Sequence, residues 1–180
     1  MSENAASLVE RTAALREAFD RSFAAARPPD PPPGEDLLAI RIGAEPYALR
    51  LSEIAALHPD RRITPLFGSL PSLRGIAAFR GAIMPVYDLA TLLGHPQAAA
   101  VRWLATAASE PIAFAFAAVD GHLQVAHDAI VSNGADERPH RYVREFARMT
   151  DQGARPIVHL PSVIDAVRRL ISPDPQSEGR

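Results

Sequence analysis

The chain has 180 residues, of which 47% are hydrophobic and 22% charged, and its formal net charge is -2. This composition is typical of a folded soluble domain, and the balance of charges argues against a nucleic-acid-binding surface. Because the sequence contains no cysteine, it excludes disulfide bonds, thiol nucleophiles and cysteine metal sites.

Residues 1–27 are predicted to form one amphipathic helix. Its apolar residues recur at helical spacing, with charged residues between them: Leu8, Leu15, Phe19 and Phe23. The segment lacks the basic and apolar regions of an export signal, and no stretch of the chain is apolar enough to insert into a membrane. Two roles stay open for this helix: packing on its own domain, or docking to a partner or to a second copy of the chain.

A proline-rich linker is predicted at residues 28–35, where PPDPPPGE disfavours a helix and favours an extended spacer. From residue 36 to 172, short apolar segments alternate with turn residues roughly every 8 to 12 positions, which is typical of an all-β fold. We expect a hairpin from LLAIRIG and AEPYALRLSEI, then three strands and a short helix from RRITPL, SLRGIAAFRG, AIMPVYDL and LATLLG. These five strands and the helix are expected to form one small barrel. Residues 173–180 are expected to be a disordered tail.

The chain also contains a weak internal repeat. A shift of 65 residues aligns EPYAL (45–49) with EPIAF (110–114), and a shift of 71 aligns PVYDLATLL (85–93) with PIVHLPSVI (156–164). The matching segments occur in the same order in both halves. We therefore predict two related barrels, which should pack on each other because a barrel of about 60 residues is marginally stable alone.

No group of residues indicates catalysis or metal binding. The sequence has no glycine-rich phosphate loop, HExxH or GxSxG motif, and none of its histidines are paired at the helical spacing of two metal ligands. Asp88 ends an expected strand just before a helix, where its carboxylate is expected to cap the helix. Structural roles are also expected for Pro85 at a strand edge, Leu89 in the core and Gly94 at the helix end. We predict no catalytic residue, no metal and no cofactor.

Arg80 lacks such a structural explanation. It lies between Phe79 and Gly81, where the chain is expected to turn between two strands, so its guanidinium should be at the surface or in a groove. Three interpretations remain open: an ion pair with an acid of the same chain, a contact with a partner's carboxylate or carbonyl groups, or a ligand-binding or enzymatic site shared with Asp88.

These segments resemble a known family. From Gly75 to Gly94 the chain follows the pattern G-apolar-x-x-x-RG-x-x-x-PV-x-DL-x-x-x-LG, and the segments around it agree in order over residues 36–170: LLAIRIGAEPYALRLSEI, AFAAVDGHLQV and ARPIVHLPSVIDAV. In these features the chain is similar to the CheW-like domain of bacterial chemotaxis coupling proteins.

The resemblance implies a mainly β fold of two packed five-stranded, SH3-like β-barrels with short helices and no catalytic activity. It also implies an adaptor that bridges the regulatory domain of a CheA-like histidine kinase and the cytoplasmic tip of methyl-accepting chemoreceptors, in the cytoplasm beside membrane-bound receptor arrays. The arginine-glycine pair of the family, near its receptor-contacting groove, matches Arg80 and Gly81, preceded by Phe79. Its structural positions match Gly75, Pro85, Asp88, Leu89 and Gly94.

Two positions depart from the family pattern. Ala78 stands where asparagine is common, and His159, followed by Pro161, stands where an aspartate commonly precedes the second helix. The N-terminal helix and the linker also exceed the minimal domain. The alternative function is therefore a specialised accessory or decoy adaptor, for example in a pilus or biofilm pathway.

Overall fold

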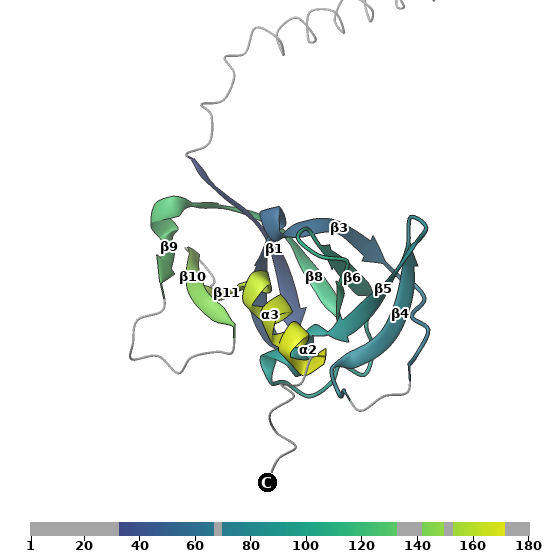
Figure 1. Ribbon diagram of the computed structural model, residues 1–180. Helices are drawn as coiled ribbons and strands as arrows, with labels where there is room; N and C mark the ends of the chain where they lie inside the picture. Colours follow the sequence, from purple (N-terminus) through teal and green to yellow (C-terminus); the bar gives the residue numbers. More distant parts are fainter. Residues whose placement is uncertain (1–32, 67–69, 133–141, 150–152, 172–180) are drawn as a thin grey trace, which may run out of the picture. The chain divides into compact units, whose positions relative to one another are not determined.

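The structure is a computed structural model that describes residues 33–66, 70–132, 142–149 and 153–171. The chain divides into two units, Met1–Pro32 and Pro33–Arg180. Every element described below belongs to the second unit (Figure 1). The predicted N-terminal helix, residues 28–32 of the predicted linker and the C-terminal tail lie outside the described residues. The end of the predicted linker differs from the expectation, because Gly34 and Glu35 already belong to the first strand, β1.

The described residues form eleven strands in two sheets. The six-stranded sheet has the order β8-β1-β2-β11-β10-β9, and the five-stranded sheet has the order β3-β6-β7-β5-β4. The strands are β1 Gly34–Ile42, β2 Glu45–Arg50, β3 Ile54–Pro59, β4 Leu73–Phe79, β5 Ala82–Asp88, β6 Trp103–Ala107, β7 Ala113–Phe116, β8 Ala118–Ala126, β9 Ile130–Ser132, β10 Val143–Met149 and β11 Gly153–Val158. Two short 3-10 helices and two α-helices complete them: η1 Leu51–Glu53, η2 His127–Ala129, α2 Leu89–Leu93 and α3 Leu160–Ile171.

The mainly β character predicted from the sequence is confirmed, but the first five strands do not form one barrel. The β1–β2 hairpin lies in the six-stranded sheet, where β2 pairs with β11. Strands β3, β4 and β5 lie in the other sheet, together with the β6–β7 hairpin. The β1–β2 hairpin of the first half thus belongs to the sheet whose other strands come from the second half. The β6–β7 hairpin of the second half belongs to the sheet whose other strands come from the first half. The expected count of five strands holds for one sheet and is wrong for the other, which has six.

The strand register confirms the internal repeat. In one parallel pair Ala48 of β2 lies opposite Ile157 of β11, and in the other Ala113 of β7 lies opposite Val86 of β5. The shift of 65 residues converts Ala48 into Ala113, and the shift of 71 converts Val86 into Ile157. The two sheets are therefore built alike around an exchanged hairpin.

The edges of each sheet are joined by one segment of chain. In the six-stranded sheet, η2 leads from edge strand β8 to edge strand β9. In the five-stranded sheet, the segment after β3 returns to edge strand β4, where the backbone groups of Thr64 and Ile76 exchange hydrogen bonds of 2.8 and 2.9 Å. Gly75 permits this approach, since a Cβ atom there would lie 2.0 Å from the Thr64 carbonyl oxygen.

Apolar side chains are buried on both faces of the central strands. One large cluster joins the two sheets to α2 and α3 and includes Leu49, Leu89, Phe114, Val158 and Leu160. Two smaller clusters lie on the opposite faces, one for each sheet. Central strands such as β7, with the sequence AFAF, are accordingly buried along their whole length. The shared core makes the two sheets one packed body.

Candidate protein-interaction site at the β4–β5 turn

The β4–β5 hairpin turns through only two residues, Arg80 and Gly81. Phe79 and Ala82 pair across it, and φ is 46° at Arg80 and 87° at Gly81. Positive φ at both central residues is characteristic of a type I′ turn, whose twist matches that of the flanking strands. A glycine adopts this conformation freely, whereas another L-residue loses about 1–2 kcal/mol in the left-handed region. Arginine therefore occupies a position that asparagine or glycine would fill with less strain.

Arg80 is exposed and has no hydrogen bond or ion pair with any residue in the described part of the chain. The interpretation that it pairs with an acid of its own chain thus gains no support. Three residues later Ile83 has 70% of its surface exposed, the most among the large hydrophobic residues that the structure describes as exposed. The turn therefore presents an unpaired cation beside an apolar side chain.

The base of the turn is held by an aromatic contact. Phe79 is buried, and its ring centroid lies 4.8 Å from that of His58 on β3. Burial lowers the pKa of His58, and the positive charges of Arg61 and Arg80 lower it further. His58 is consequently neutral at pH 7 and adds no second charge beside Arg80.

Asp88 is fully buried at the other end of β5, where it caps α2. One carboxylate oxygen accepts hydrogen bonds from the backbone N–H of Thr91 at 2.8 Å and from its hydroxyl at 3.0 Å. The other oxygen lies 3.1 Å from Nε of Arg74, with which it forms an ion pair. Among the described residues, the first oxygen thus has hydrogen bonds and the second has the ion pair but no hydrogen bond. The carboxylate is closed to solvent.

Arg80 and Asp88 do not share a site. They lie at opposite ends of β5, which runs from Ala82 to Asp88 and at about 3.3 Å per residue extends over roughly 20 Å. The hypothesis of a catalytic or ligand-binding Arg80–Asp88 pair is wrong, because the arginine beside Asp88 is Arg74.

Arg74 was not singled out from the sequence. The pairing of β4 with β5 shifts register between Leu73 and Gly75, so Arg74 is the additional residue of a β-bulge. A bulge changes the direction of a side chain relative to the regular alternation of a strand. A signal for this role was present, since Arg74 directly precedes the one glycine of β4, and glycine inside a strand often marks a bulge.

Within the described residues there is no group of three or more histidine, aspartate or glutamate side chains arranged to hold a metal ion. The helices of the same residues include none long and apolar enough to cross a membrane.

Comparisons with known proteins agree with this arrangement. The family model of the CheW-like domain matches residues 36–168. Among solved structures, the chain is similar to the scaffolding protein CheW of Thermoanaerobacter tengcongensis, with 19% sequence identity, a TM-score of 0.62, and coverage of 71% of this chain and 90% of that one. No curated protein sequence matches the chain. Since the family model covers well over half of the residues, the chain belongs to the CheW-like domain family, a family of non-catalytic scaffold proteins.

Proposed function

We propose that this protein is a signalling adaptor that couples a CheA-like histidine kinase to the cytoplasmic tips of chemoreceptors, in the cytoplasm beside membrane-bound receptor arrays. Coupling of kinases and receptors is the general role of the family. In this proposal Arg80 and Gly81 form the receptor-contacting part of the surface. Phe79, expected from the sequence to take part in this contact, is buried and instead supports the turn from within.

The observation that carries the proposal is the state of Arg80. An arginine in a left-handed turn position reduces the stability of the fold, and here no internal hydrogen bond or ion pair among the described residues offsets this loss. Strained residues of this kind concentrate at functional sites. A guanidinium held at the tip of a two-residue turn has all its donors available for a partner's carboxylate or carbonyl groups.

The packing of the two sheets suits an adaptor. A stable protein–protein interface buries about 800 Å² on each partner, and an adaptor has to present two such surfaces at a fixed relative angle. The exchanged hairpins tie each sheet to both halves of the chain, and the shared core includes residues of both sheets. Both features oppose rotation of one sheet relative to the other.

Binding of charge-reversal variants to membranes that contain chemoreceptors tests the proposal. Arg80→Glu should weaken receptor binding by roughly 1–3 kcal/mol, the effect of losing a charge-assisted contact. Arg148→Glu is the matched control, because Arg148 is also exposed but belongs to β10 of the other sheet. Equal binding of the two variants would contradict the role of Arg80.

Co-sedimentation of receptor membranes, kinase and this protein separates an adaptor from a decoy. An adaptor increases the amount of kinase that sediments with receptors and raises its activity there. A decoy binds one component and reduces the amount of kinase in the pellet.

A further inference from the structure

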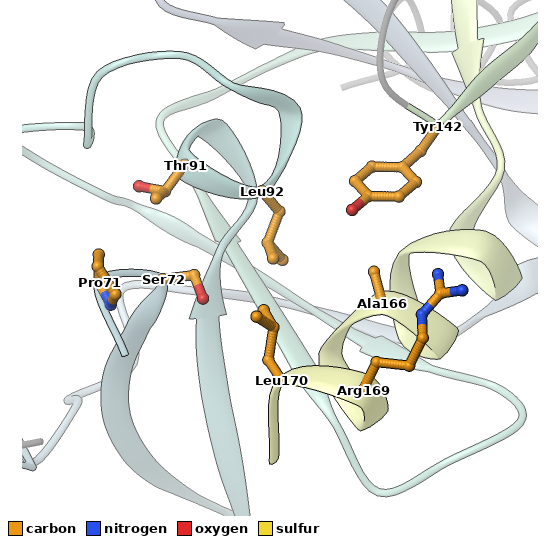
Figure 2. A pocket seen from close by; sticks show the side chains of 8 residues that line it. All are labelled: Pro71, Ser72, Thr91, Leu92, Tyr142, Ala166, Arg169 and Leu170. Atoms are coloured by element: carbon orange, nitrogen blue, oxygen red, sulfur yellow. The ribbon is translucent and has the colours of Figure 1, made fainter. Parts of the chain in front are cut away.

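A pocket with a volume of about 390 Å³ lies between α2 and α3. Its polar lining comes from Ser72, Thr91, Tyr142 and Arg169, and no acidic side chain lines it. Its apolar lining consists of Pro71, Leu92, Ala166 and Leu170. In Figure 2 the apolar side chains Leu92 and Leu170 stand between Ser72, on the α2 side, and Tyr142 with Arg169, on the α3 side.

Ser72 and Tyr142 occupy equivalent positions of the internal repeat. The carbonyl oxygen of Ser72 accepts a hydrogen bond from the N–H of Asp88, the residue that precedes α2. The carbonyl oxygen of Tyr142 accepts one from the N–H of His159, the residue that precedes α3. The asymmetry between the helices shapes the pocket, because α2 ends after five residues whereas α3 continues for twelve. Arg169 and Leu170 belong to the additional turns of α3.

Three donors at this pocket have no partner among the described residues. Ser72 is only 4% exposed, and its hydroxyl has no hydrogen bond. A buried hydroxyl without a partner costs roughly 1–3 kcal/mol, so a polar ligand atom at this point is favourable. The Tyr142 hydroxyl and the Arg169 guanidinium also have no hydrogen bond or ion pair with another described residue. The pocket thus offers donors at both ends and an apolar middle.

We propose that this pocket binds a small organic carboxylate with an apolar body and a second polar group at its far end. Arg169 and Tyr142 bind the carboxylate, and Ser72 hydrogen-bonds the far group. A water molecule occupies about 30 Å³ in the liquid. On this scale the pocket accommodates roughly a dozen non-hydrogen atoms. A hydroxylated aromatic acid has the required size and polarity.

Three related probes separate the contributions of the carboxylate and of the far hydroxyl to binding. The first is 4-hydroxyphenylacetate, the second is phenylacetate, which lacks the far hydroxyl, and the third is 2-(4-hydroxyphenyl)ethanol, which lacks the carboxylate. Each is titrated into the full-length, ¹⁵N-labelled protein while amide chemical shifts are recorded. We expect saturable shifts that centre on the pocket residues and the tightest binding for 4-hydroxyphenylacetate.

Single substitutions assign each end of the ligand. Arg169→Gln should weaken both carboxylates by about tenfold or more, as expected for a charge-assisted hydrogen bond, and leave the alcohol unchanged. Ser72→Ala should weaken 4-hydroxyphenylacetate and not phenylacetate. Arg148→Gln is the control, because Arg148 is an exposed arginine on β10. It should change the binding of neither carboxylate.

Absence of saturable shifts overturns the proposal, and so does equal binding to the Arg169→Gln and Arg148→Gln variants. The pocket lies at the opposite end of β4 from Arg80, since Ser72 precedes the strand and Phe79 ends it. Receptor binding and ligand binding therefore fail or succeed independently in these tests.

Discussion

Replacement of Arg80 by asparagine separates the structural role of this position from its proposed function. Asn tolerates the left-handed conformation that the turn requires, with φ of 46° at Arg80. The substitution removes backbone strain and breaks no hydrogen bond or ion pair within the described residues. Arg80→Asn should therefore stabilise the fold by about 1 kcal/mol, which for a domain of this size corresponds to a rise in Tm of roughly 3 °C.

The same substitution should weaken receptor binding. Asn lacks the charged fork of the guanidinium, so the loss should be about 1–3 kcal/mol, or roughly 5- to 150-fold in Kd. Urea and thermal unfolding measure the first effect, and binding to receptor membranes measures the second. Arg148→Asn serves as the control for binding, because that arginine is exposed on the other sheet.

The two results test different steps of the argument. Lower stability of Arg80→Asn would refute the argument that the left-handed arginine is strained. Unchanged receptor binding would refute the argument that the strain is retained for a contact. Removal of the Arg80 charge should also raise the pKa of His58, which that charge lowers, and an NMR titration of the His58 ring checks that the two side chains interact in solution.

Three further substitutions test the packing of the fold, each by urea denaturation. Asp88→Asn keeps a capping side chain but leaves Arg74 without its carboxylate, so the fold should lose roughly 3 kcal/mol or more; a loss below about 1 kcal/mol would show that the ion pair is not important. Gly75→Ala should be among the most destabilising substitutions, because the new Cβ would lie 2.0 Å from the Thr64 carbonyl oxygen; a protein of normal stability would contradict the close approach of these segments. Burial raises the pKa of Glu53, so the ionised carboxylate opposes folding, and wild-type stability should gain from this group as the pH falls through the raised pKa. Glu53→Gln should accordingly be more stable than wild type at pH 7 and lose that advantage near pH 4; a constant difference across this range would contradict the raised pKa.

The sequence predicts which segments recur better than it predicts which segments pair. The shifts of 65 and 71 residues correctly related β2 to β7 and β5 to β11, as the register of the parallel pairs shows. Yet both repeats carry the same alternation of apolar residues. The pattern therefore does not show whether a strand pairs within its own repeat or with the equivalent strand of the other repeat. The exchange is visible only in the structure, where β2 lies beside β11 and β7 beside β5.

Within the site, the position of Arg80 was predictable and its conformation was not. Its neighbour Gly81 indicated a turn, and a charged residue in a turn is expected at the surface. The left-handed backbone depends on the two-residue length of the loop, which is set by the pairing of Phe79 with Ala82. The proximity of Arg74 to Asp88 likewise depends on a bulge, which shifts the register by one residue.

His159 shows how the second repeat compensates for a missing aspartate. It occupies the position of Asp88, and Arg144, the bulge residue that corresponds to Arg74, bonds instead to the Ser162 hydroxyl at 3.0 Å. The carboxylate at the start of α3 comes from the first repeat, where Glu53 of η1 accepts the N–H of Leu160 at 2.9 Å.

This replacement links the two repeats more closely. The first helix is capped from within its own hairpin by the carboxylate of Asp88, which also pairs with Arg74 and so fixes the end of β5 opposite the turn. The second is capped by two groups: the ring of His159, whose Nδ1 accepts the N–H of Ser162 at 3.3 Å, and Glu53 on the short connection that carries the chain from β2 in one sheet to β3 in the other. A movement of the sheets relative to each other would break the hydrogen bond between Glu53 and Leu160. The departure at His159 therefore fits a scaffold that has to hold its two sheets at a fixed angle while the β4–β5 turn presents Arg80.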